Sequence, residues 1–402
     1  MWDMVAKALW LTIVGIGEDG AEGLTAAARA ALDEARLITG APRQLALLPP
    51  LKAEHLPWPV PFDDGIAPLL ARRGEPVVML ASGDPFWFGA GASITRHLEP
   101  GEWIAHPAPS TFSLAAARLG WPLHRVACHG LHAAPLGRLR PDLAPGARLI
   151  VLLRDGAAVG DLAAYITDAG FGASSLHVME ALGGPRERIR QAQADGFALA
   201  DIRHPVAVGV ETAGEGRVMS RASGLADDWF DHDGQISKRP VRALALSALA
   251  PRPGETLWDI GAGSGSIAIE WLLSHGSTQA LAFEANPTRA ARARANAARL
   301  GADRLTVIEG RAPTALHGQA RPDAIFIGGG LSDPLVGAIL ALPRPVRVVA
   351  HAVTLESEAS LAHWHARLGG DLLRIELASA APLGSRRGWR PAYPVVQWSV
   401  AL

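Results

Sequence analysis

The residues with the clearest chemical purpose form a short glycine-rich segment in the second half of the chain. Asp259 is followed by Ile-Gly-Ala-Gly-Ser-Gly at the end of an apolar run, and a helix-like stretch spans 267–276. Alternate glycines let the backbone turn sharply and let a ligand approach where a Cβ would collide. The following helix directs its free amide groups towards that ligand. Glu284 ends the next strand-like run, where its carboxylate could accept hydrogen bonds from both hydroxyls of a ribose. The segment predicts a nucleotide-cofactor site.

Two classes of cofactor use such a loop, and the glycine spacing separates them. Dinucleotide enzymes favour G-x-G-x-x-G, whereas the G-x-G-x-G after Asp259 resembles class I S-adenosylmethionine-dependent methyltransferases. NAD binding and a bare glycine-rich turn remain the alternatives. The Asn-Pro-Pro-Tyr sequence of many amino-group methylases is absent, so methylation of an exocyclic base nitrogen is not expected. The resemblance implies that S-adenosylmethionine contacts Gly261, Ala262, Gly263, Ser264, Gly265 and Glu284.

Flanking segments narrow this resemblance to one branch. Residues 231–238, Asp-His-Asp-Gly-Gln-Ile-Ser-Lys, are similar to the Gly-Gln-x-(Ser/Thr)-Lys segment of the decarboxylating precorrin methyltransferases of cobalamin synthesis. IEGRAP, IFIGGG and AHAVTLES further along are similar to the same branch. The resemblance adds Ser237 and Ala312 to the cofactor contacts, with Ala312 against the adenine ring. The alternatives are a helix N-cap for Ser237, a surface carboxylate for Glu284 and simple packing for Ala312.

The first half carries a different, ordered set of glycine turns at strand ends. Four such segments in this order resemble the tetrapyrrole methylases, which bind S-adenosylmethionine in a cleft between two α/β subdomains. A Gly-Asp-Pro sequence alone is simply a good turn, so the order of the segments carries the resemblance. The segments are 14–25, 81–91, 108–121 and 178–189. The matching positions, expected to bind the cofactor, are Gly15, Gly17, Gly83, Asp84, Ser110, Thr111 and Glu180.

Two positions depart from that family's usual pattern. Glu18-Asp19-Gly20 stands where many relatives have Gly-Pro-Gly, a variant that suits the C5-methylating branch. His129-Gly130-Leu131 stands where the family has His-Gly-Arg, which puts substrate contacts near this loop in doubt.

The elements that must position these residues alternate along the chain. Strand-like runs alternate with alanine-rich helical stretches, including a helix expected over 24–38, which argues for α/β units with mainly parallel strands. Apolar periodicity is lost around 213–236, where Gly, Asp and Ser accumulate. We therefore expect a two-subdomain tetrapyrrole methylase (class III methyltransferase) over 1–212, a linker over 213–230, and a Rossmann-like class I methyltransferase over 231–402.

The two resemblances in this order imply a bifunctional cobalamin-pathway enzyme with one S-adenosylmethionine in each domain. The first domain would methylate C5 of precorrin-6B. The second would methylate C15 and remove carbon dioxide from the acetate side chain on C12, giving precorrin-8. Both families commonly self-associate, so a homo-oligomer is expected.

The substrate carries several carboxylates, and guanidinium groups should line its pocket. Trp389, within the same stretch as three arginines, could stack on the macrocycle, although an exposed basic loop is the plainer interpretation. His351, near the end of an apolar run, is the candidate for handling protons, with a satisfied strand-end histidine as the alternative. The candidate substrate-binding residues are Lys238, Arg239, Arg242, Arg386, Arg387 and Arg390.

Composition limits the remaining possibilities. The 38 Lys and Arg against 39 Asp and Glu give a net charge of −1, without the basic surplus usual for a nucleic-acid partner. Cys128 is the single cysteine, and Cys128, His129 and His132 have no further metal ligand elsewhere in the sequence to join them, so no metal site is expected.

The first twenty residues lack a cleavage site and no apolar run is long enough to span a membrane, so a cytoplasmic location is expected. An RNA methyltransferase, or one non-catalytic half, remain the rival functions.

Overall fold

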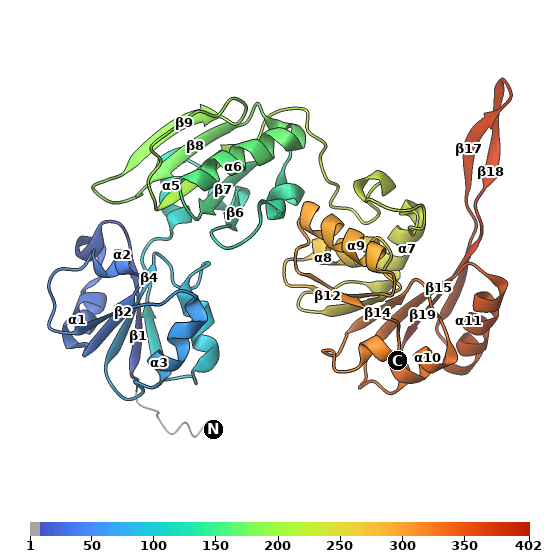
Figure 1. Ribbon diagram of the computed structural model, residues 1–402, viewed down its shortest axis with the longest axis horizontal. Helices are drawn as coiled ribbons and strands as arrows, with labels where there is room; N and C mark the ends of the chain where they lie inside the picture. The colour runs from blue at the N-terminus through green and yellow to red at the C-terminus, as the bar shows by residue number, and fades with distance from the viewer. Residues whose placement is uncertain (1–8) are drawn as a thin grey trace. The chain divides into compact units, whose positions relative to one another are not determined.

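The chain forms two units in the computed structural model, which describes residues 9–402 (Figure 1). The N-terminal unit comprises the described residues up to Ala134 together with Ala144–Arg217. The C-terminal unit comprises Pro135–Leu143 and Val218–Leu402. The first eight residues, which enter the argument against a cleaved leader, lie outside the described part. None of the helices within 9–402 combines the length and apolar character needed to cross a bilayer.

The first lobe of the N-terminal unit is a five-stranded sheet whose neighbouring strands are all parallel, in the order β3-β2-β4-β1-β5. The inner strands β1 and β4 are buried along most of their length because both faces are covered, so they are continuous apolar runs. The helix expected over 24–38 ends at Glu34, and the apolar residues after it form β2. The strands are β1 Leu11–Ile16, β2 Leu37–Gly40, β3 Glu54–Pro57, β4 Val77–Ser82 and β5 Trp103–His106, and the helices are α1 Ala26–Glu34, α2 Pro42–Leu45, α3 Ile66–Leu70 and α4 Ala90–Ile94.

The second lobe of the N-terminal unit contains a mixed sheet in the order β6-β7-β10-β8-β9. Only β6 and β7 are parallel, so the expectation of mainly parallel strands is wrong here. The reasons are that β10 lies between β7 and β8 and runs antiparallel to both, and that the short connection between β8 and β9 makes them a hairpin. Phe112 of α5 packs against Ile150 and Met179 of this sheet. The elements are α5 Thr111–Leu119, β6 Ala127–Gly130, β7 Arg148–Leu153, α6 Ala157–Ile166, β8 Ser175–Glu180, β9 Arg188–Gln193 and β10 Val206–Glu211.

The C-terminal unit is a doubly wound seven-stranded sheet in the order β13-β12-β11-β14-β15-β19-β16. Its first five strands are parallel, and β19 runs antiparallel to both of its neighbours. The strand order reverses direction between β11 and β14, so a ligand is expected beyond the carboxyl ends of these two strands. The elements are α7 Arg239–Leu249, β11 Thr256–Ile260, α8 Ser266–Ser274, β12 Gln279–Glu284, α9 Pro287–Arg299, β13 Leu305–Glu309, β14 Ala324–Ile327, α10 Asp333–Leu340, β15 Arg347–Ala352, α11 Leu355–Leu368, β16 Asp371–Ile375 and β19 Val395–Ala401.

Two further segments complete the C-terminal unit. Strands β17 (Ala378–Leu383) and β18 (Arg386–Pro391) pair only with each other, as a two-stranded ribbon that projects from the sheet (Figure 1). The segment Pro135–Leu143 contains the 3-10 helix Leu136–Asp142, whose Arg138 forms an ion pair with Asp303 at 2.8 Å. The C-terminal unit therefore includes a segment that comes from within the first half of the sequence.

Candidate functional sites

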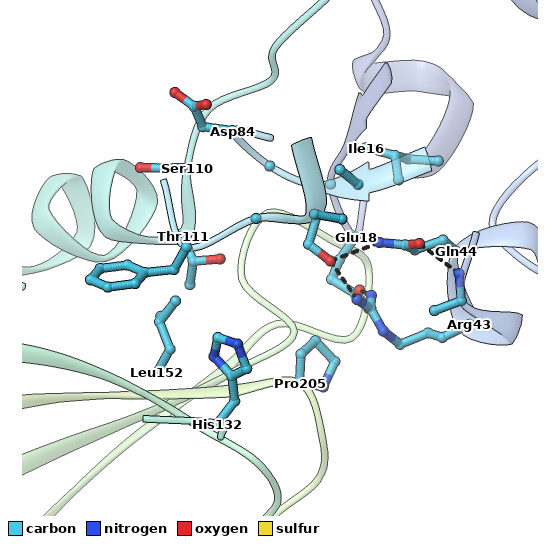
Figure 2. Close-up of a pocket in the computed structure, with 18 of the residues that line it drawn as sticks. Ile16, Glu18, Arg43, Gln44, Asp84, Ser110, Thr111, His132, Leu152 and Pro205 are labelled. Carbon is cyan, nitrogen blue, oxygen red and sulfur yellow. Dashed lines mark hydrogen bonds and ion pairs between the residues drawn. The ribbon is translucent and has the colours of Figure 1, made fainter. Parts of the chain in front are cut away.

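The N-terminal unit contains a cavity of about 560 Å³. One side is formed by loops that follow the carboxyl ends of β1, β2 and β4, with the start of α5 beside them. The other side is formed by the second lobe, including Leu152, Met179 and Ala207 (Figure 2 shows Leu152). The walls are largely apolar, with a few polar side chains. This size and lining are typical of a small-molecule site, for which about 300–1,000 Å³ is usual.

Most of the residues expected to bind a cofactor in the first half line this cavity: Gly17, Gly83, Asp84, Ser110 and Thr111. Gly15 lies just behind them. A Cβ on Gly15 would come 2.5 Å from the amide nitrogen of Ala108 and would also collide with Gly83, so only glycine fits between these two segments. Ser110 caps α5, because its Oγ accepts a hydrogen bond from the amide of Ser113 at 3.1 Å. The cavity therefore has the volume and the close main-chain walls that S-adenosylmethionine requires.

Glu180 is the exception and corrects the expectation from sequence. Its side chain is 2% exposed and lies outside the cavity lining. It pairs with Arg188 at 2.6 Å and Arg190 at 2.9 Å, and it accepts a hydrogen bond from the amide of Arg203. Burial alone would raise the pKa of Glu180, but these arginines and the amide hold it below the usual value. Its carboxylate thus pairs with two arginines of β9 and does not line the cavity.

Several cavity residues were not found from the sequence. Glu18, Arg43 and Gln44 form a polar cluster at one side, as Figure 2 shows. Trp87 and Phe88 bring aromatic rings to the lining. Glu18 belongs to the Glu18-Asp19-Gly20 departure, and Trp87 and Phe88 lie within the matching segment 81–91, whereas Arg43 and Gln44 belong to no recurring motif.

The cysteine and histidines near 130 form no metal centre. His132 lines the cavity, and burial raises the pKa of Cys128 to about 11, so its thiol stays protonated. Throughout residues 9–402, no group of three His, Cys, Asp or Glu side chains is arranged to hold a metal ion.

In the C-terminal unit, the glycine loop after β11 is held by a neighbouring carboxylate. Gly261, Gly263 and Gly265 all have left-handed φ values, of +71°, +58° and +75°. Glu284, which is 7% exposed, accepts hydrogen bonds from the amides of Gly263 and Asn286, both at 2.8 Å. A Cβ on Gly261 would lie 2.9 Å from the amide nitrogen of Gly329, across the point where the sheet reverses direction. The loop therefore lies where the topology predicts a ligand.

Two buried polar atoms beside this loop lack a partner within residues 9–402: Oδ1 of Asp259 and Oγ of Ser264. The other carboxylate oxygen of Asp259 accepts a hydrogen bond from the amide of Ala268 at 3.1 Å. Burial, with a smaller effect of the charge on Glu284, raises the pKa of Asp259 to about 7. Buried polar atoms without partners are rare in folded proteins. Their presence beside left-handed glycines fits a site that a polar cofactor such as S-adenosylmethionine completes.

The remaining expected cofactor residues lie around the loop. The carbonyl of Gln235 is 3.6 Å from where a Cβ of Gly263 would stand, so the segment before α7 passes close to the loop. Ser237 belongs to this segment, and its carbonyl accepts a hydrogen bond from Arg242. Ala312 follows β13, half-buried against a core that includes Leu316. Ala262 and Ser264 lie within the loop itself.

Arg242 corrects the expectation for the substrate side. It is fully buried, with its Nε 2.5 Å from Glu270 and a second contact to Asp227 at 3.2 Å. Its plane also stacks over Phe230 at 4.8 Å. The guanidinium of Arg242 is engaged by these contacts inside the C-terminal unit and is not accessible to a substrate.

The other basic candidates are exposed but lie on separate elements. Lys238 and Arg239 stand at the start of α7. Arg386, Arg387 and Arg390 lie on the ribbon, where alternation places Arg387 on the same face as Trp389, which is 78% exposed.

His351 lies in β15, one residue beyond Ala350, which pairs in register with Ile327 of β14. It is therefore level with Gly328, the first of the three glycines at the carboxyl end of β14. The His351 Nε2 is 3.0 Å from Oε1 of Gln397, and the ring meets Phe326 edge-on. Burial lowers the pKa of His351, although the hydrogen bond to Gln397 acts in the opposite direction. The imidazole is thus a neutral group at the edge of the sheet where the topology predicts a ligand.

The chain is similar to known proteins over nearly its full length. Residues 10–197 match the family model for tetrapyrrole (corrin/porphyrin) methylases, and residues 228–402 match that for the precorrin methyltransferase domain. A Sinorhizobium protein named precorrin-6Y C(5,15)-methyltransferase (decarboxylating) is 50% identical over 396 residues, covering 97% of this chain and 96% of the relative. A Salmonella typhimurium protein named cobalt-precorrin-6B C(15)-methyltransferase (decarboxylating) is 34% identical over 167 residues, covering 40% of this chain and 85% of the relative.

Among solved structures, the C-terminal domain of precorrin-6Y C5,15-methyltransferase from Rhodobacter capsulatus is similar, with 47% identity and a TM-score of 0.44. The match covers 46% of this chain and 100% of that structure.

Proposed function

The chain belongs to the family of decarboxylating precorrin-6Y C(5,15)-methyltransferases, and we propose that it methylates precorrin-6B at C5 and C15 and decarboxylates the C12 acetate. The product is precorrin-8, an intermediate of cobalamin biosynthesis. The N-terminal unit methylates C5, the C-terminal unit performs the other two reactions, and each unit binds its own S-adenosylmethionine.

The observation that carries this proposal is the glycine loop held by Glu284, with the unpartnered oxygens of Asp259 and Ser264 beside it. A second site of suitable size, built from different loops, lies wholly within the N-terminal unit. Two sites of different design in one chain support two methyl transfers, one for each unit.

The length of one relative supports this assignment of the reactions to the two units. The Salmonella protein is named for both C15 methylation and decarboxylation, and its 167 aligned residues are 85% of its length. A protein of that size is about as long as the region 228–402 that matches the precorrin methyltransferase domain. Since one such domain accounts for both of those reactions, the C5 methylation falls to the tetrapyrrole methylase unit.

Methyl transfer requires the protein mainly to position the two reactants. S-adenosylmethionine, when bound, supplies an electrophilic methyl carbon on a sulfonium sulfur. In the N-terminal unit, the main chain around Gly17 and Gly83 holds the donor, and the apolar walls exclude water from the reaction. In the C-terminal unit, the loop from Gly261 to Gly265 and Glu284 hold and orient the second donor.

Decarboxylation also needs a proton. The bond between the acetate methylene and its carboxyl carbon breaks, carbon dioxide leaves, and the electron pair passes into the macrocycle. A proton then completes the methyl group at C12. His351 is the group placed to move it: with Nε2–H donated to Gln397, its Nδ1 can take up a proton from solvent and pass it to the methylene carbon.

The test is incubation with precorrin-6B and methyl-labelled S-adenosylmethionine, followed by mass spectrometry. Two labelled methyl groups should be gained and carbon dioxide lost. Gly263→Val forces a β-branched residue into a left-handed position and should abolish C15 methylation and decarboxylation while C5 methylation continues. Gly276→Ala is the matched control, because a Cβ there meets nothing. Loss of C5 methylation in a folded Gly263→Val protein would contradict the division of labour.

A further inference from the structure

The carboxylate of Glu18 lies between two guanidinium groups. Its Oε1 pairs with Arg43 and its Oε2 pairs with Arg186 at 3.0 Å. Glu18 is 8% exposed and lines the cavity of the N-terminal unit together with Arg43. Arg43 also donates a hydrogen bond to Ser82 Oγ at 3.0 Å. Two positive charges share one negative charge here, so the cluster carries a net charge of +1.

The three side chains come from separate loops that meet at this point. Glu18 follows β1 and Arg43 lies in α2, both in the first lobe, whereas Arg186 lies between β8 and β9 in the second lobe. The approach is close: a Cβ on Gly184 would lie 2.6 Å from both the Cβ and the carbonyl oxygen of Glu18. The cluster is therefore held in place by the backbone on both sides of the cavity.

Both guanidinium groups keep donors available to a ligand. The side chain of Arg186 is 55% exposed and uses one nitrogen for Glu18, while Arg43 is 28% exposed. Burial and the nearby charge of Arg186 lower the pKa of Arg43, so an additional anion would relieve this repulsion. The other carboxylate of the lining, Asp84, lies apart from Glu18 and Arg43 in Figure 2 and accepts a hydrogen bond from the Phe86 amide.

We propose that Arg43 and Arg186, positioned by Glu18, bind a carboxylate of a reactant in the N-terminal unit. The planar fork of a guanidinium matches a carboxylate with two parallel hydrogen bonds, and the apolar walls around it strengthen the attraction. This inference rests on the proposed function, which supplies two sources of that group: an acid side chain at the edge of the tetrapyrrole, or the methionine carboxylate of S-adenosylmethionine.

The experiment compares Arg186→Gln, Arg186→Lys and a control, Arg72→Gln, in the full-length protein. Arg72 is also a partly exposed, ion-paired arginine of this unit, but its partners Glu54 and Glu75 do not line the cavity, whereas Glu18, the partner of Arg186, does. The rate of C5 methylation, followed by the signal of a labelled methyl carbon, gives KM for precorrin-6B and for S-adenosylmethionine separately. Melting temperatures equal to that of the wild type show that each variant is folded.

For Arg186→Gln we expect one of the two KM values to rise about tenfold, with kcat within about twofold, since a hydrogen bond to a charged group is lost. Arg186→Lys, which keeps the charge and loses the fork, should lie between the wild type and Arg186→Gln. A higher KM for precorrin-6B assigns the carboxylate to the substrate, and a higher KM for S-adenosylmethionine assigns it to the cofactor. If Arg186→Gln matches Arg72→Gln in both values, the carboxylate site is refuted. If the wild type transfers no methyl group to C5, the proposed function itself fails.

Discussion

Glu284 accepts a hydrogen bond from the amide of Gly263 while its second oxygen accepts one from the amide of Asn286. One carboxylate at the end of β12 thereby fixes the loop after β11 and the turn before α9. Each of its oxygens retains a lone pair for a ligand hydroxyl. A single side chain thus both shapes the loop and offers acceptors to the ribose of a bound cofactor.

Glu284→Ala should weaken S-adenosylhomocysteine binding in the C-terminal unit about 10- to 100-fold, because hydrogen bonds to a charged group are worth about 1.5–3 kcal/mol. Titration calorimetry should then detect one tight site in place of two, while C5 methylation stays unchanged. Glu309→Ala is the control. Glu309 is the register partner of Glu284 on β13, but it pairs with Arg294. Equal loss in both variants would show that Glu284 has no special role.

The raised pKa of Asp259 predicts a stability that falls with increasing pH. The folded protein keeps a proton on Asp259 up to about pH 7, whereas the unfolded chain releases it near its ordinary value of 3.8. The contribution of Asp259 to the unfolding free energy therefore decreases by roughly 4 kcal/mol as the pH rises from 3.8 to about 7. Above about pH 7 this contribution stays constant. Asp259→Asn should lack this decrease. Hydrogen exchange of the β11 amides, compared between the two proteins from pH 5 to pH 8, measures it; parallel profiles would contradict the buried protonated carboxyl.

His351→Asn should slow carbon dioxide release by a factor of about 100 or more, as expected when a group that transfers a proton is lost. C5 methylation should not change. Because burial lowers the pKa of His351 from its ordinary 6.5, the imidazole carries the proton that it delivers only below pH 6.5, so the wild-type rate of carbon dioxide release should rise as the pH falls below that value. Gln397→Leu removes the hydrogen bond that raises this pKa, and should move this rise to still lower pH.

The control for this test is His363→Asn, at a histidine on the exposed side of α11. Undiminished carbon dioxide release from a folded His351→Asn protein would remove His351 from the mechanism.

Arg242→Met should destabilise the C-terminal unit by roughly 3–5 kcal/mol, because it leaves the buried carboxylate of Glu270 without its cation. Arg239→Met, three residues earlier and exposed, should change stability by no more than about 0.5 kcal/mol. Thermal unfolding of the two variants is the measurement. A stable Arg242→Met protein with a raised KM for precorrin-6B would instead return Arg242 to the substrate site.

The parts of the sites that lie within one short segment could be predicted from the sequence. The three left-handed glycines and Glu284 form a local motif, since a loop and the end of the next strand fully specify that geometry. Glu18, Arg43 and Arg186 could not be found in this way. Glu18 and Arg43 come from different loops of the first lobe, and Arg186 joins them only through the packing of the two lobes, so no spacing in the sequence records the contact.

For Glu180 and Arg242, the sequence pattern around each residue already indicates a partner inside the fold. Arg188 and Arg190 alternate on one face of β9, opposite the end of β8, so two arginines were available to neutralise Glu180. Arg242 lies on the helix face that also carries Ala245 and Leu249, which is the buried face of α7. In both cases the periodicity of the element predicts a partner inside the fold.

Because Pro135–Leu143 belongs to the C-terminal unit, no single cut in the gene separates the two units completely. A fragment beginning at Val218 would lack Arg138, the cation that Asp303 pairs with. A fragment ending at Arg217 would carry that stretch without Asp303. A gene divided between codons 217 and 218 would therefore place one short segment of the C-terminal unit on the other polypeptide.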